Sequence, residues 1–272
     1  MTKDCLKRKR EAPQDAPQED EQKPTSQVKR FRSSFADTMT ILVGKDKAPF
    51  IVHTKTLRAK SDFLNAAFQR EWLERQTKVV NLQEVKPKIF ELYVTWSYFE
   101  RIDLEILRLV ETGNANPLGR DDETDDETEE QRKVWADGTR SLVRLYVAAD
   151  FLGDAGLKRH TIDCLANILE AINQLHGLGR LLIFVWQSTP PGSGLRKFML
   201  DYIASVRTLM HDWLAKLVGV LPTDFYVDLA LHQLWRERSS DDLRHNPLPE
   251  RKHMYYDGYE SDTLDASDAS DA

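Results

Sequence analysis

The first apolar pattern in the chain has a period of two, which is typical of a half-buried strand. Met39, Ile41 and Val43 alternate with their neighbours, and a GKD turn follows them. A second apolar run, residues 50–52, leads directly into His53. The pattern predicts a β-hairpin that feeds a helix.

Helical spacing replaces the alternation after the hairpin. Leu57 and Phe63 stand at helical offsets, and Ser61 between them can accept a hydrogen bond from a free backbone N–H and so begin a new helix. Residues 79–82 then predict a third strand, and Pro87 opens an amphipathic helix. The predicted order is two strands, two helices, a strand and a helix.

The second half of the chain reads as helices with buried stripes, because its apolar residues recur every three or four positions. A short strand and a helix start are predicted at residues 102–109. Glycines and prolines then divide the remaining helices, which are predicted at residues 142–152, 157–175, 178–188, 195–218 and 222–238.

The order of these features resembles the BTB/POZ domain over about residues 36–169. The resemblance is carried by an Asp that opens the first strand, a Phe-x-Val-His that ends the hairpin, a Ser-x-Phe helix start and a late LVRLYVAADFL helix. Its signature positions, expected to be structural, are Asp37, His53, Leu57, Ser61, Tyr146 and Leu152. It implies an α+β fold, a small and mostly three-stranded sheet flanked by helices. An all-helical extension follows, similar to that of short fungal-type BTB proteins.

Composition separates a folded body from two polar ends. Both ends lack the apolar residues that would offset the entropy of ordering, so they are predicted to be disordered. The predicted segments are a tail at 1–33, a BTB/POZ domain at 34–175 with an acidic loop insertion at 113–138, a helical extension at 176–238, and an acidic tail at 239–272.

The acidic insertion contains the run DDETDDETEE at residues 121–130. Like charges at this density repel one another, so a solvated loop is predicted. A calcium loop is disfavoured because the run has no glycine at the bend. Thr124 and Thr128 stand in an acidic context that acidophilic kinases read, and their phosphorylation remains a hypothesis.

Charge and cysteine content narrow the function classes. The formal net charge of −6 argues against general nucleic-acid binding, which depends on basic residues. Two cysteines, Cys5 and Cys164, provide neither a disulfide framework nor a thiolate metal site, so an intracellular, reducing location is expected. The longest apolar run, residues 181–186, is far shorter than the ~20 residues that cross a bilayer.

The sequence contains no Gly-rich phosphate loop, no metal-ligand cluster and no motif that pairs a nucleophile with a general base. We therefore expect neither an enzyme nor a cofactor. The resemblance implies a protein–protein interaction module, an adaptor or scaffold that self-associates or joins a substrate to a cullin-based ubiquitin ligase. Candidate interaction residues are Phe63, Phe68, Trp72 and Glu74.

Two family motifs depart from their usual form. Cullin-recruiting members carry an apolar-x-Glu motif, where this chain has Phe68, Gln69 and Arg70. Transcriptional members pair the opening Asp with a basic residue directly after the strand-ending His. Thr54 occupies that position here, so the repressor-type groove is not expected.

A nuclear regulatory factor that acts through protein partners is the alternative. It rests on basic clusters that can serve as an import signal, Lys7, Arg8, Lys9, Arg10, Lys29 and Arg30. At the other end of the chain, Tyr255, Tyr256 and Tyr259 could form a short docking motif, although a solvated tail is the simpler interpretation. The partner and the oligomeric state cannot be read from these residues.

Overall fold

The computed structural model of the protein describes residues 37–69, 77–112, 125–172, 178–205, 213–238 and 255–256. The chain divides after Ala36, and every described residue belongs to the unit Asp37–Ala272. The predicted N-terminal tail and its basic clusters therefore lie outside the described residues.

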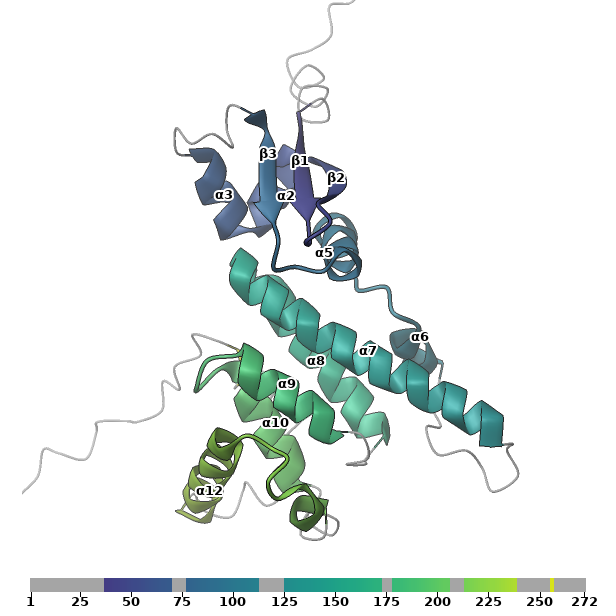
Figure 1. The fold of residues 1–272 in the computed structure, drawn as a ribbon, viewed down its shortest axis with the longest axis vertical. Helices are drawn as coiled ribbons and strands as arrows, with labels where there is room; N and C mark the ends of the chain where they lie inside the picture. Colours follow the sequence, from purple (N-terminus) through teal and green to yellow (C-terminus); the bar gives the residue numbers. More distant parts are fainter. Residues whose placement is uncertain are drawn as a thin grey trace, which may run out of the picture. The chain divides into compact units, whose positions relative to one another are not determined.

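The sheet has three strands in the order β2-β1-β3 (Figure 1). They are β1 (Thr38–Val43), β2 (Ala48–His53) and β3 (Val79–Leu82). β1 pairs antiparallel with β2 and parallel with β3, so the sheet is mixed. Met39, Ile41 and Val43 are buried as the alternation predicts. The predicted hairpin and third strand are confirmed.

Helices make up most of the rest of the described chain. They are α2 (Thr54–Lys60), α3 (Asp62–Gln69), α5 (Pro87–Phe99), α6 (Glu105–Glu111), α7 (Asp125–Leu152), α8 (Ala155–Ile172), α9 (Leu178–Ser188), α10 (Gly194–Ser205) and α12 (Thr223–Arg238). Residues 213–217 are also helical. The predicted fold class is confirmed, since a sheet with helices is followed by an all-helical segment.

Two predicted elements differ from the structure. Residues 101–104 have no regular structure and α6 begins at Glu105, so the strand predicted within 102–109 is wrong. The helix predicted at 195–218 is described as α10 and as residues 213–217, and the residues between them lie outside the description.

One hydrophobic core joins the sheet to the helical segment. Leu57, Tyr146 and Leu152 of the predicted signature contribute to it and are at most 1% exposed. Because these three side chains come from α2 and from the C-terminal part of α7, the core links residues that lie about ninety positions apart.

Ser61 connects α2, α3 and the end of α7. Its backbone N–H ends α2 by bonding to the Leu57 carbonyl, and its hydroxyl accepts from the Leu64 N–H at 3.0 Å to begin α3. The same hydroxyl donates to the Leu152 carbonyl at 2.7 Å. The predicted helix start is confirmed, and one buried side chain satisfies backbone groups from two helices.

The acidic run is helical from Asp125, where the sequence predicted a loop to residue 138. Acidic residues near a helix N-terminus interact favourably with the helix dipole, and Glu, Gln, Arg and Lys are good helix formers. Packing also favours the helix. Trp135 is buried, and a Cβ at Gly138 would lie 2.5 Å from a methyl of Ile106, so α7 approaches α6 closely.

A buried arginine organises the helical extension. The guanidinium of Arg196, on α10, donates to the carbonyls of Trp186 and Thr189 at the end of α9. It also lies 3.3 Å from the carboxylate of Asp228, on α12, which accepts from the Trp186 indole N–H. The pair connects three helices, and the buried guanidinium has several hydrogen-bonding partners.

The C-terminal tail, predicted to be solvated, contains two residues that contact the body. Tyr255 is 2% exposed and lies edge-on to Phe198 of α10. The phenol of Tyr256 donates to Asp163 of α8 at 2.9 Å. Burial and the neighbouring Asp163 carboxylate raise the pKa of Tyr256 to about 12. At these two residues the prediction of a solvated tail is wrong.

Replacing Ser61 with alanine should lower the free energy of unfolding by about 2–3 kcal/mol. The Leu64 N–H then loses its N-cap acceptor, and the Leu152 carbonyl loses its donor. Urea denaturation of the full chain measures this change. Ser141→Ala is the matched control, since among the described residues the Ser141 hydroxyl bonds to the Asp137 carbonyl in its own helix. Equal losses in the two variants would contradict the bridging role.

Candidate protein-interaction site

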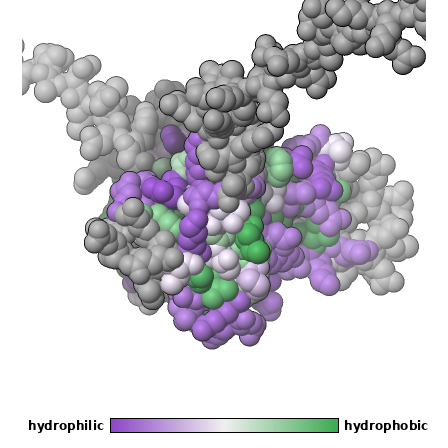
Figure 2. Space-filling model, turned by 90° about the horizontal axis from the view of Figure 1, so that it is seen from above, coloured by the Kyte–Doolittle hydropathy of each residue, from purple (hydrophilic) through white to green (hydrophobic). Residues whose placement is uncertain are grey.

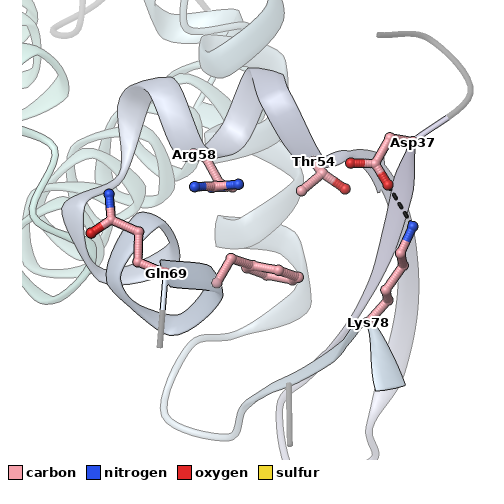
Figure 3. Close-up of a pocket in the computed structure, with 6 residues that line it drawn as sticks. Asp37, Thr54, Arg58, Gln69 and Lys78 are labelled. Atoms are coloured by element: carbon pink, nitrogen blue, oxygen red, sulfur yellow. Dashed lines mark hydrogen bonds and ion pairs between the residues drawn. The ribbon is translucent and has the colours of Figure 1, made fainter. Parts of the chain in front are cut away.

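A cavity of about 500 Å³ opens between α2, α3 and the edge of the sheet. Figure 3 shows the side chains that converge on it from these elements. They are Asp37, Thr54, Arg58, Phe68, Gln69 and Lys78. Most of this lining is charged or polar, whereas pockets for drug-sized ligands are mostly apolar. The lining therefore differs from that of a typical pocket for a small apolar ligand.

Asp37 forms an ion pair with Lys78, whose ammonium lies 2.5 Å from the carboxylate (Figure 3). Lys78 immediately precedes β3, which lies beside β1. In the sequence, Thr54 stands at the position where some family members carry the basic partner of Asp37. The partner in the structure, Lys78, was not predicted. The parallel pairing of β1 with β3 was the signal that could have identified this lysine.

Thr54 begins α2 beside this ion pair and is 4% exposed. Its hydroxyl oxygen is buried and has no hydrogen-bond partner among the described residues. Arg58, one turn further along α2, donates two hydrogen bonds to Asn65 of α3. The cavity therefore holds a fixed guanidinium, an ion pair and a hydroxyl that could still donate.

A second surface feature is an aromatic pair at the junction of α3 and α7. The rings of Phe63 and Phe151 lie 5.0 Å apart, and the two residues are 36% and 47% exposed. Gly153, with a φ of 69°, ends α7 so close to α3 that an added Cβ would lie 3.0 Å from Asp62. The close approach brings the two rings together.

Exposure alone does not mark a site, because isolated apolar side chains are normal on protein surfaces. The surface visible in Figure 2 is largely hydrophilic, with hydrophobic side chains in small groups. The Phe63–Phe151 pair differs because two large aromatic rings from distant parts of the chain share one exposed position.

The predicted interaction residues have different environments. Phe63 is on the surface, but Phe68 is only 8% exposed and packs into the core. They are five residues apart, about 140° around a helix, and this spacing was the signal that could have separated them. Trp72, Glu74 and Arg70 lie outside the described residues.

His53 is bonded to the core rather than turned toward a ligand. Its backbone N–H donates to the Tyr98 hydroxyl at 2.9 Å, and its Nδ1 lies 2.7 Å from the same oxygen. Within the described ranges, no three His, Cys, Asp or Glu side chains gather as they would around a metal ion. No helix in these ranges is long and apolar enough to cross a membrane.

The described residues thus form a mixed sheet flanked by helices, with a polar cavity and an exposed aromatic pair. Residues 28–116 match the family model for the BTB/POZ domain, so this part of the chain is a BTB/POZ domain. The match includes the sheet and helices α2, α3, α5 and α6. BTB domains are generally non-catalytic and bind other proteins. A search of curated proteins finds no significant match to the chain.

Thr54→Val should raise the free energy of unfolding by about 1 kcal/mol, because it removes a buried hydroxyl that has no described partner. Thr161→Val is the matched control. Thr161 is fully buried and its hydroxyl donates to the Leu157 carbonyl at 2.7 Å, so this change should be destabilising. Urea denaturation distinguishes the two, and a loss of stability in Thr54→Val would show that its hydroxyl is bonded.

Proposed function

We propose that the protein is a non-enzymatic adaptor or scaffold that binds partner proteins through the Phe63–Phe151 pair. The observation that carries this proposal is that the two exposed rings contact each other, 5.0 Å apart and tilted by 39°, at a junction fixed by a buried hydrogen bond. Aromatic side chains are enriched at the energetic centres of protein interfaces. A rigid pair also loses little side-chain entropy when a partner binds.

A cullin scaffold is the partner that we propose for this surface. Family members that recruit cullins use the segment around the helix that corresponds to α3, and Phe63 lies on that helix. The buried side chain of Phe68 is unsuited to direct contact, so Phe63 takes the role of the apolar anchor in this proposal.

We further propose that the BTB unit continues beyond residue 116 to about residue 175, as the sequence predicts. Tyr146 and Leu152 of α7 belong to the same core as the sheet, and the Ser61 hydroxyl bonds to α7. In this arrangement α9, α10 and α12 form an extension that is available for a second partner.

Isothermal titration of the full chain with the N-terminal helical region of a BTB-binding cullin tests the adaptor role. We expect submicromolar binding that Phe63→Ala and Phe151→Ala each weaken at least about tenfold, an effect of ~1.4 kcal/mol. Phe99→Ala is the matched control, because Phe99 is 68% exposed on α5. It should bind like the unsubstituted chain.

No binding at about 100 μM would exclude a stable specific cullin interface. The same substitutions could then be tested against proteins that co-purify with the chain. If Phe63→Ala and Phe99→Ala bound a partner equally well, the aromatic pair would not be the contact surface.

A nuclear regulatory factor is the second candidate, and the Asp37–Lys78 pair favours it. The resemblance associates transcriptional members with a charged pocket at the opening Asp, and Lys78 supplies a cation there in place of Thr54. The basic N-terminal clusters would provide nuclear import.

Localisation of the tagged full chain tests this alternative. Replacing Lys7 to Arg10 and Lys29 to Arg30 with glutamine should abolish nuclear accumulation, because import receptors bind these charges. Lys45→Gln with Lys55→Gln is the control, since both lysines are exposed on the folded domain. An unchanged distribution after the cluster substitutions would remove the basis for the nuclear role.

A further inference from the structure

Helix α12 packs onto the helical extension through one of its faces. Phe225 is fully buried on this inner face and Leu229 is 8% exposed. Asp228 accepts from the Trp186 indole of α9, and His232 lies 2.9 Å from an aspartate of α10. The face is therefore occupied by both apolar and polar contacts.

The opposite face of α12 is also apolar, although it is exposed. Val227, Leu231 and Leu234 are 52%, 61% and 59% exposed. They are four and three residues apart, so they form one stripe over two helical turns. The outward face of a surface helix is normally polar, and a continuous apolar stripe marks an interaction surface.

The charges at the two ends of this stripe indicate its partner. Asp224, which is exposed, comes seven residues before Leu231, and the Arg238 position comes seven residues after it. Seven residues are about two helical turns, so all three positions follow one line along the helix. In an antiparallel pair centred on Leu231, the Asp224 position of one copy lies opposite the Arg238 position of the other.

We propose that the outer face of α12 binds the same face of a second copy of this chain, as an antiparallel helix pair. Such a contact is isologous, so the charge complementarity occurs twice, once at each end. Opposed helix dipoles add to it. The proposal concerns a different surface from the Phe63–Phe151 pair and does not depend on the adaptor role.

The size of the contact determines its strength. A 16-residue helix is about 24 Å long, and one pair of such helices buries less than the roughly 1,200–2,000 Å² of a standard interface. The dimer should therefore be reversible and depend on protein concentration.

Sedimentation velocity of the full chain, from about 1 to about 200 μM, tests the proposal. The sedimentation coefficient should rise with concentration, and Leu231→Asp should raise the dimer Kd at least tenfold because two buried carboxylates would meet at the two-fold axis. Ile51→Asp makes a comparable change on β2, where Ile51 is 74% exposed, and should leave the Kd unchanged.

A charge exchange tests the orientation of the pair. Asp224→Arg and Arg238→Asp should each weaken the dimer about fivefold, because like charges then face each other. The double variant should restore the Kd. Failure of this restoration would overturn the antiparallel arrangement.

Two results would overturn the second copy as the occupant. One is a dimer whose Kd is unaffected by Leu231→Asp. The other is a chain that stays monomeric at every concentration. In that case, comparing the Tm of Leu231→Asp with that of the unsubstituted chain shows what covers the outer face of α12. A lowered Tm would show that the chain covers this face itself, and an unchanged Tm would leave the face to a different protein.

Discussion

The hydroxyl of Ser61 is the contact on which the geometry of the junction between α3 and α7 depends. It accepts from the start of α3 and donates to the end of α7, two segments that lie about ninety residues apart in the sequence. Apolar packing can bring helices together, but it is non-directional. A buried hydrogen bond fixes their orientation, because an unpaired donor or acceptor there is costly. Phe63 and Phe151 are close in sequence to Ser61 and Leu152, so this hydrogen bond also fixes the relative position of the two rings.

Most of the fold follows from local patterns in the sequence. Alternation in β1, a serine before α3 and a proline at the start of α5 have direct physical consequences, and the structure contains each of them. One exception is the start of α7. Charge repulsion in the acidic run predicted a loop, whereas helix propensity and contacts made further along the same helix favour helical backbone. Those contacts join α6 and α7, and no pattern within the run reports them.

The candidate site was harder to predict than the fold, because its residues come from separate elements. Asp37 was identified by its place at the start of β1, but its partner Lys78 is brought there by parallel strand pairing. Phe63 and Phe68 were both predicted to contact a partner, but their spacing of five residues puts them on different faces of α3, one exposed and one buried. Phe151 was read as part of a helix, since its closeness to Phe63 depends on the tight end of α7.

The polar contacts of Arg196 have a consequence for α12. Both faces of this helix carry enough apolar residues to be buried, so the hydrophobic effect alone gives little preference between them. Asp228 stands on only one of the faces, and it meets both the guanidinium of Arg196 and the indole of Trp186. A half-turn rotation of the helix would take this acceptor away from the Trp186 indole N–H and from Nη1 of Arg196, which would keep only its bonds at the end of α9. Directional bonding inside the extension thus selects the side of α12 that the protein presents to its surroundings.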